Sequence, residues 1–184
     1  MKRTSQFFYQ NSNLKVVFLI TAIFMGYLIL VMVPKATGFE LSSSNVKSLG
    51  TSFGFDQSDI TTFFNTRTDV MIDAYINFNQ VWDALFGLIY GLMYVVWVSV
   101  LFKPFFNKVG SINLIPLAQV LFDWLENYTL GTLAQQYLVD GTITSSTADL
   151  ASAFCMIKWI FSGLTYILIL VGIILLIVRF FKMK

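Results

Sequence analysis

Two carboxylates and an amide, Asp123, Glu126 and Asn127, stand within an apolar stretch of the sequence. Insertion scales put the free-energy cost of one such charge in the middle of a bilayer at about 2.5–3.5 kcal/mol, so these groups normally face a protein interior or a water-filled cavity. Asp123 and Glu126 are three residues apart and share one face of a helix. They can form a structural hydrogen-bonded core, line a proton or ion path, or act as acid and base in an active site.

The composition is typical of an integral membrane protein. Hydrophobic residues make up 57% and charged residues 12% of the 184 residues, whereas about a quarter of the residues of a soluble domain are charged. The chain has no histidine and one cysteine, Cys155. An internal disulfide, a CxxC redox pair and a cysteine metal cage are therefore excluded, and the usual general base and zinc ligand is missing. We expect no cofactor, no metal site and no nucleic-acid partner.

Four apolar stretches are long enough to cross a bilayer, which takes roughly 20 residues. We expect spanning helices over residues 16–33, 81–102, 114–134 and 150–178, packed as an all-α, four-helix transmembrane bundle in one domain of residues 1–184. Pro34 is expected to end the first helix. The first stretch is longer than the apolar core of about 7–15 residues in a secretory signal peptide, so we favour a retained anchor over a cleaved signal.

The segment between the first two apolar stretches, residues 35–79, is polar and rich in Ser, Thr and Asn. Ser58 is placed to cap a short helix that carries Ile60 and Phe64 on one side, and a second helical pattern begins near Asp69. We expect a partly helical extracytoplasmic cap on the membrane surface. A solvated connecting loop without a role of its own is the alternative.

Basic residues beside the apolar stretches decide the orientation. Those that fall on one side are Lys2, Arg3, Lys15, Lys103, Lys108, Arg179, Lys182 and Lys184. Short loops rich in Lys and Arg stay in the cytoplasm. We therefore predict a multi-pass protein with both termini cytoplasmic.

Polar residues on different helices can be compared by depth, because an α-helix rises about 1.5 Å per residue. Counted from cytoplasmic ends at Lys15, Phe102, Asn113 and Val178, a polar cluster lies roughly 18–20 Å deep or within a turn of that level. Its members are Asp123, Glu126, Asn127, Tyr27, Tyr90 and Tyr166. Phenol hydroxyls can donate hydrogen bonds to the carboxylates. Asp83 and Lys158 both come out about 28–30 Å deep and are predicted to form an ion pair.

Gly87 and Gly91 are four residues apart in the second apolar stretch. Such a pair of small residues lets another helix approach closely. We expect a close helix contact beside Tyr90.

Two strings of the sequence, DALFGLIYG at 83–91 and DWLEN at 123–127, resemble those of an uncharacterised group of small bacterial membrane proteins with four helices. That group carries a D-x-x-F-P-x-x-Y-G string and, on the next helix, a D-x-x-E-N string. The positions that the resemblance marks here are Tyr75, Asp83, Tyr90, Asp123, Glu126 and Asn127. It implies a bacterial inner (plasma) membrane and brings no known activity. Gly87 stands where the group often has Pro, and Thr66-Arg67 replaces a Gly-Arg pair expected before Tyr75.

The sequence shows no nucleophile–base pair, metal cage or nucleotide-binding loop. We therefore expect a structural or accessory protein rather than an enzyme: a scaffold, an assembly factor or a small subunit of a membrane complex. Its candidate partners are the lipid bilayer, other membrane subunits, and a lipid or small molecule in an outward-facing cavity. One alternative is a small transporter or proton-coupled subunit in which Asp123 and Glu126 titrate. Another is a membrane-embedded lipid-modifying enzyme that uses them as acid and base.

Overall fold

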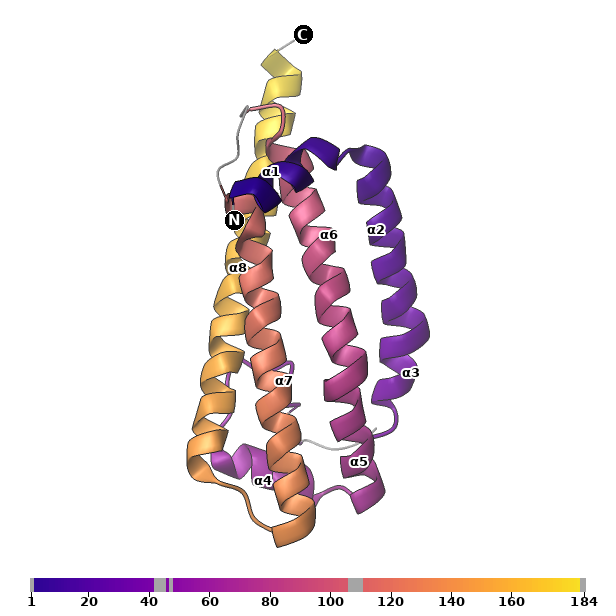
Figure 1. The fold of residues 1–184 in the computed structure, drawn as a ribbon, viewed down its shortest axis with the longest axis vertical. Coiled ribbons are helices and arrows are strands. Elements are labelled where there is room, and N and C mark those ends of the chain that lie inside the picture. The colour runs from indigo at the N-terminus through magenta and orange to yellow at the C-terminus, as the bar shows by residue number, and fades with distance from the viewer. Residues whose placement is uncertain (1, 42–45, 47, 106–110, 183–184) are drawn as a thin grey trace.

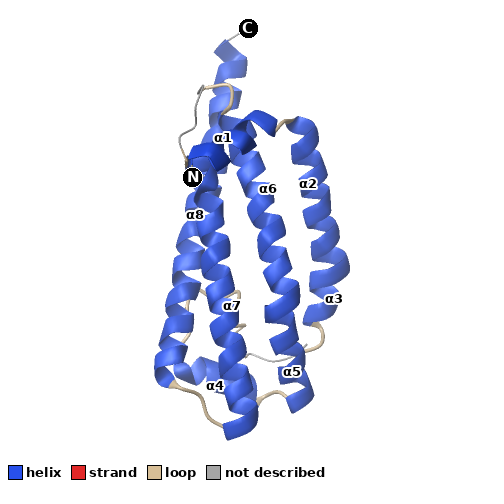
Figure 2. Ribbon diagram, viewed as in Figure 1, coloured by secondary structure: helices blue, strands red, loops and turns tan. Residues whose placement is uncertain are grey.

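The computed structural model describes residues 2–41, 46, 48–105 and 111–182. These residues form helices, turns and loops, and no strand occurs among them (Figure 2). The all-α prediction is therefore confirmed for the described part of the chain. Lys108 and Lys184, two of the basic residues used to predict the orientation, lie outside it.

Four long helical segments run side by side, and both termini lie at the same end of the molecule (Figure 1). The first segment joins α2 (Leu14–Tyr27), a π-helical turn (Leu28–Met32) and α3 (Val33–Ala36). The second joins α5 (Asp69–Asn77), a π-helical turn (Phe78–Asp83) and α6 (Ala84–Phe102). The third and fourth are α7 (Ile115–Asp140) and α8 (Ser145–Lys182). A short 3-10 turn, Ile112–Leu114, leads into α7.

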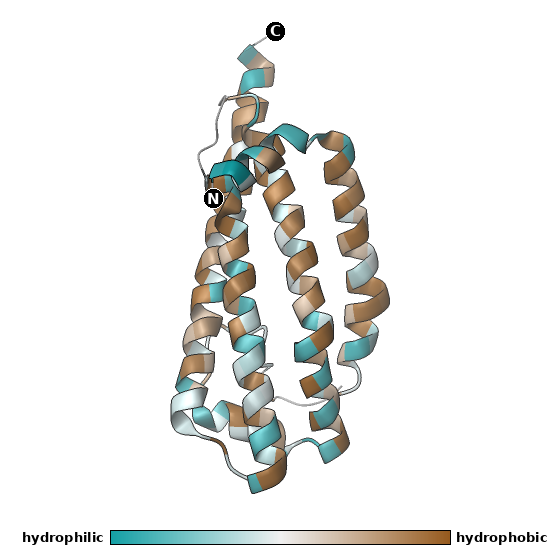
Figure 3. Ribbon diagram, in the orientation of Figure 1, coloured by the Kyte–Doolittle hydropathy of each residue, from teal (hydrophilic) through white to brown (hydrophobic). Residues whose placement is uncertain are grey.

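Three helical segments of the described chain are long and apolar enough to cross a membrane: Leu14–Ala36, Asp69–Phe102 and Ser145–Lys182. The predicted spans 16–33, 81–102 and 150–178 lie within them. α7 covers most of the predicted span 114–134 but is not among the three. Figure 3 shows the reason, since apolar residues dominate α2 whereas polar residues recur along α7.

The first long helix continues through Pro34 to Ala36, so the predicted stop at the proline is wrong. A proline inside an α-helix removes one hydrogen bond, and its ring clashes with the carbonyl four residues earlier. Here a π-helical turn precedes the proline, and the Val33 N–H donates to the carbonyl of Leu28, five residues back. The wider π turn changes the spacing of the carbonyls before the ring and lets the helix continue.

The second long helix begins at Asp69, inside the predicted cap of residues 35–79. Thr68 caps it, because its side chain accepts a hydrogen bond from the Met71 N–H at 3.4 Å. The helix then runs through the π-helical turn Phe78–Asp83 into α6 without a break. Only the chain before Asp69 therefore forms a separate segment at the end of the molecule opposite the termini.

That segment contains α4 (Gln57–Asn65), and its N-cap is Asp56 rather than the predicted Ser58. Asp56 accepts a hydrogen bond from the Asp59 N–H at 2.8 Å, and Asp59 accepts one from the Asp56 N–H at 3.1 Å. This reciprocal capping box satisfies two backbone donors at once. Ser58 only adds its hydroxyl to Asp56, at 2.7 Å. The predicted apolar side of the helix is buried, with Ile60 and Phe64 both 0% exposed.

Replacing Asp56 by alanine is expected to destabilise α4 by about 1 kcal/mol, the usual loss on removing an N-cap side chain. Ser58→Ala serves as the control, since Ser58 does not bond to a backbone N–H. Amide hydrogen exchange over Gln57–Asn65 measures both effects. Equal acceleration of exchange in the two variants would contradict the assignment of the cap.

The larger apolar core lies at the end opposite the termini, where α4 and α5 pack on α7 and α8 (Figure 1). Its fully buried members are Leu49, Ile60, Phe63, Phe64, Ile72, Leu130, Leu133, Ala134, Ala148, Ala151 and Cys155. At the other end, α1 (Lys2–Asn11) lies across the long helices. Tyr9 of α1 packs against Val98, Leu101 and Phe102. Large apolar side chains of α2 and α8 are exposed between the two ends, which suits a lipid environment.

Candidate functional site

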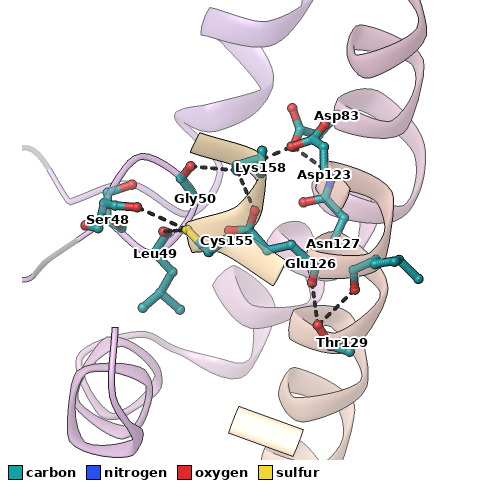
Figure 4. Close-up of polar contacts among 12 residues, drawn as sticks. Ser48, Leu49, Gly50, Asp83, Asp123, Glu126, Asn127, Thr129, Cys155 and Lys158 are labelled. Carbon is teal, nitrogen blue, oxygen red and sulfur yellow. Dashed lines mark hydrogen bonds and ion pairs between the residues drawn. The ribbon is translucent and has the colours of Figure 1, made fainter. Parts of the chain in front are cut away.

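The buried ammonium group of Lys158 lies at the centre of the polar residues (Figure 4). Its Nζ is 2.5 Å from Glu126 Oε2 and 3.3 Å from Asp123 Oδ1, and it donates to the carbonyl oxygen of Gly50 at 3.0 Å. Lys158 is 7% exposed and Glu126 is 0% exposed. The contact joins α8, α7 and the loop before α4. We call Lys158, Asp123, Glu126, Asp83 and Asn127 the lysine cluster.

The amide of Asn127 connects the cluster to the second long helix. Its Nδ2 donates to Asp83 Oδ2 at 2.9 Å. Asp83 is the last residue of the π-helical turn that precedes α6. The predicted partner of Asp83 was Lys158, but the lysine pairs with the two carboxylates of α7 instead. Asp83 instead accepts a hydrogen bond from the neutral amide of Asn127.

Gly87 makes room for the Asp123 carboxylate beside α6. A Cβ atom at Gly87 would lie 3.0 Å from Asp123 Oδ2 and 3.1 Å from Trp124 Nε1. Trp124 Nε1 donates to the Ala84 carbonyl at 2.9 Å. One turn further on, a Cβ atom at Gly91 would lie 2.3 Å from Val120 Cγ2. The predicted close helix contact at the two glycines is therefore confirmed, and the neighbour is α7.

The predicted tyrosines lie in two different environments. The Tyr27 hydroxyl donates to the Trp82 carbonyl at 3.0 Å, and the Tyr94 hydroxyl donates to that of Tyr166 at 3.5 Å. These hydroxyls thus bond away from the carboxylates. Tyr75 and Tyr90 are buried, 4% and 7% exposed. The Tyr75 hydroxyl lies beside Asn79 and the Tyr90 hydroxyl beside the Asp123 carboxylate, neither with a well-aligned hydrogen bond.

A cavity of about 340 Å³ lies beside the lysine cluster, between the first two long segments, α7 and α8. Its polar walls include Glu40, Asn79, Asp83, Gln119, Asp123, Lys158 and Ser162. Its aromatic walls include Phe24, Phe39, Tyr75, Phe78, Phe86, Tyr90, Tyr94, Trp159 and Tyr166. Pockets of roughly 300–1,000 Å³ with mostly apolar walls and a few polar groups are typical of small-molecule sites.

The two π-helical turns, Leu28–Met32 and Phe78–Asp83, contact each other beside this cavity. Met32, Phe78, Asn79 and Asp83 come from these turns and line it. The side-chain amide of Asn79 donates to the Tyr75 carbonyl at 2.8 Å and so supplies a partner to the backbone of α5 just before the turn. Single π-helical turns within α-helices occur frequently at functional sites.

The thiol of Cys155 is another polar group of α8 that faces the loop before α4. Its Sγ lies 3.1 Å from the Ser52 carbonyl oxygen and 4.0 Å from that of Leu49, and the residue is 0% exposed. Sequence reasoning missed the contact of this loop with α8, because no periodic pattern marks residues 48–55. No group of three or more His, Cys, Asp or Glu side chains that could hold a metal ion occurs within the described residues.

Arg67 ties the chain after α3 to α4 outside the long helices. Its Nε donates to the Phe39 carbonyl at 2.8 Å and its Nη1 to the Phe63 carbonyl at 2.7 Å. The guanidinium also lies 3.4 Å from the centre of the Phe63 ring. Partial burial lowers the pKa of Arg67 below its ordinary value, and nearby Tyr75 and Glu40 oppose that shift.

Comparisons of the chain with protein-family models, with curated proteins and with solved structures found no match. The functional conclusions below therefore rest on the geometry of the lysine cluster and of the cavity.

Proposed function

We propose that this protein is a structural or accessory membrane protein: a scaffold, an assembly factor or a small subunit of a membrane complex. The strongest support is that the Lys158 ammonium group contacts three oxygens, from Glu126, Asp123 and the Gly50 carbonyl. An ammonium group has three N–H donors, and three oxygens surround this one. The contacts fasten the loop before α4 to α7 and α8. A role in holding the molecule together therefore accounts for each of these buried polar groups.

The proposal includes α7 as a fourth membrane span. α7 packs against both α6 and α8, and its polar residues Gln119, Asp123, Glu126 and Asn127 are all buried. These four polar groups therefore do not face lipid, which is the usual arrangement of ionisable residues in a membrane. This gives the predicted four-helix transmembrane bundle.

The proposed orientation places the end with both termini in the cytoplasm of a bacterial cell, within the plasma membrane. Lys2, Arg3, Lys103, Arg179 and Lys182 all belong to that end of the molecule (Figure 1). Cytoplasmic flanks of membrane helices carry an excess of Lys and Arg. The loop before α4, which lines one side of the cavity, then faces outward.

The charge-free variant Asp123→Asn/Glu126→Gln/Lys158→Met tests the structural role. Replacement of a buried ion pair by apolar residues of similar volume is often neutral or stabilising. Asn and Gln keep the shapes of Asp and Glu, so we expect this variant to fold in membranes with nearly the wild-type yield. We also expect it to restore growth to a strain that depends on the chain. Size-exclusion chromatography in detergent measures the folded yield, and complementation measures the function.

A small transporter or proton-coupled subunit is the second candidate, and one observation favours it. Three carboxylates, Asp83, Asp123 and Glu126, lie around one ammonium group, and two of them line the cavity. Buried surplus negative charge is unfavourable unless a proton or a cation accompanies it. On this hypothesis the charge-free variant folds normally but fails to restore growth. That outcome would overturn the structural proposal.

The geometry adds no support to a lipid-modifying enzyme. An acid–base pair needs one carboxyl group that can donate a proton to the substrate and another that can accept one. Asp123 and Glu126 both contact Lys158.

A further inference from the structure

The cavity beside the lysine cluster contains buried oxygen atoms that can accept further hydrogen bonds. Gln119 Oε1 makes no hydrogen bond with the described residues. The Tyr90 hydroxyl lies within hydrogen-bonding reach of the Asp123 carboxylate, but neither it nor Asp123 Oδ2 has a well-aligned partner among those residues. Asp123, Gln119 and Tyr90 are 4%, 8% and 7% exposed, and all line the cavity. Buried polar groups are nearly always hydrogen-bonded, so the unpaired Gln119 Oε1 beside this carboxylate indicates a donor from outside the chain.

The positions of the three residues on α6 and α7 bring these oxygens close together. Gln119 and Asp123 are four residues apart on α7, so their side chains are neighbours on one helix face. Tyr90 lies on α6, one turn after Gly87, where the Asp123 carboxylate approaches that helix. All three can accept a hydrogen bond. They can surround a group that carries several N–H donors.

The charge of the cavity favours a positive ligand. Asp83 and Asp123 line it, Glu126 lies behind Lys158, and Lys158 is the one basic residue in the walls that the structure describes. Asp123 uses only Oδ1 for Lys158. Glu40 adds another carboxylate to the wall and is exposed. A cation can therefore enter beside Glu40 and compensate the surplus of carboxylates.

The remaining walls suit an organic cation rather than a bare metal ion. Phe86 stacks on Tyr27 and packs edge-on against Tyr90, with ring centres 6.2 and 5.5 Å apart. Phe86, Tyr90 and Trp159 all line the cavity. Aromatic faces attract ammonium groups through the ring quadrupole and also cover apolar ligand surface.

We infer that the cavity binds a small amphiphilic amine, with its primary ammonium group at Asp123 Oδ2, Gln119 Oε1 and the Tyr90 hydroxyl. The apolar part of the ligand lies against Phe86 and Trp159. The ammonium donates to these three oxygens, and the Tyr90 hydroxyl can accept such a bond while it donates to the Asp123 carboxylate. A free amine and the headgroup of an ethanolamine lipid share this chemistry. The inference does not depend on the proposed structural function, because a scaffold and a transporter can both hold such a ligand.

Isothermal titration calorimetry on the full chain in phosphatidylcholine nanodiscs tests the inference, with empty nanodiscs as the blank. The probes are 2-phenylethylamine, neutral 2-phenylethanol and anionic 3-phenylpropanoate. We expect the amine to bind at least about tenfold more tightly than either of the others, as one charge-assisted hydrogen bond allows. Equal binding of the amine and the alcohol, or no binding of the amine, would overturn the inference.

Two variants locate the binding site. Asp123→Asn should abolish the preference for the amine, and Tyr90→Phe, which changes no charge, should weaken amine binding by about threefold to tenfold. The control is Asp149→Asn, since Asp149 is exposed on α8 and is not among the residues of the cavity wall. Amine binding that Tyr90→Phe leaves unchanged would overturn the assignment, even if Asp123→Asn fails to fold. Competition by phosphatidylethanolamine in the nanodisc would identify the lipid as the source of the ammonium group. A lack of competition would identify a free amine as its source.

Discussion

Lys158→Met is expected to lower the free energy of unfolding by about 3–5 kcal/mol, the usual effect of removing one partner from a buried ion pair. Methionine fills a similar volume but leaves Glu126 and Asp123 buried without their cation. The Gly50 carbonyl loses its donor at the same time. Unfolding of the purified protein in mixed detergent micelles by increasing SDS measures the change.

The matched control is Lys15→Met, because Lys15 is an exposed lysine at the start of α2. It should unfold within about 0.5 kcal/mol of the wild type, as surface substitutions usually do. If Lys158→Met were no less stable than Lys15→Met, the lysine cluster would not hold the helices together. A loss that the charge-free triple variant does not recover would show that the lysine contributes more than charge compensation.

Gly91→Ala is expected to destabilise the protein, although alanine favours a helix over glycine by about 1 kcal/mol. The new Cβ would lie 2.3 Å from Val120 Cγ2, and Val120 is 4% exposed and β-branched, so it cannot turn aside. α6 and α7 must then move apart, and such overpacking typically costs about 1–3 kcal/mol. The same SDS titration measures the effect.

Gly26→Ala provides the opposite expectation. A Cβ atom at Gly26 of α2 has nothing within 4 Å, so this variant should equal or exceed the wild type in stability. Adding Val120→Ala to Gly91→Ala removes the atom that the new Cβ meets and should restore part of the loss. Similar stabilities for Gly91→Ala and Gly26→Ala would contradict a close contact of α6 with α7.

The sequence was sufficient for the three apolar helical segments, though not for their ends, and for the polar face of α7. Long apolar stretches identify spanning helices because the bilayer demands them. Likewise, the spacing of Asp123, Glu126 and Asn127 indicates one helix face without any knowledge of neighbours. The two glycines predicted a close contact for the same local reason. Each of these properties depends on residues near one another in the chain.

The partner of the two carboxylates could not be predicted, because it depends on the axial register of α8 relative to α6 and α7. The depth of Lys158 was counted from Val178, but Gly172 is the residue of α8 that packs on the end of α6. A Cβ atom there would lie 2.8 Å from Leu101 Cβ. The difference, 178 − 172, is six residues or about 9 Å. That shift brings Lys158 down to the level of Glu126, where it pairs with both carboxylates of α7.

The directions of the tyrosine hydroxyls were also beyond the sequence. Depth alone placed Tyr27 and Tyr166 beside the carboxylates, yet Tyr27 bonds to the Trp82 carbonyl and Tyr166 is 49% exposed. The direction of a side chain depends on the rotation of its helix, and the π-helical turns change that rotation. The continuation of the first helix through Pro34 could not be predicted either, because no pattern in the sequence marks the π-helical turn before it.

The length of α8 makes the lysine cluster sensitive to the thickness of the bilayer. Its 38 residues span about 57 Å, far more than the hydrocarbon core of about 30 Å. Phe180 and Phe181 are exposed near its C-terminal end, together with the basic residues Arg179 and Lys182. Such residues anchor a helix at the membrane–water interface. Because α8 is unbroken, the position of that anchor sets the depth of Lys158, some 30 Å away along the helix. Hydrophobic mismatch at one leaflet therefore tends to displace Lys158 relative to its carboxylate partners.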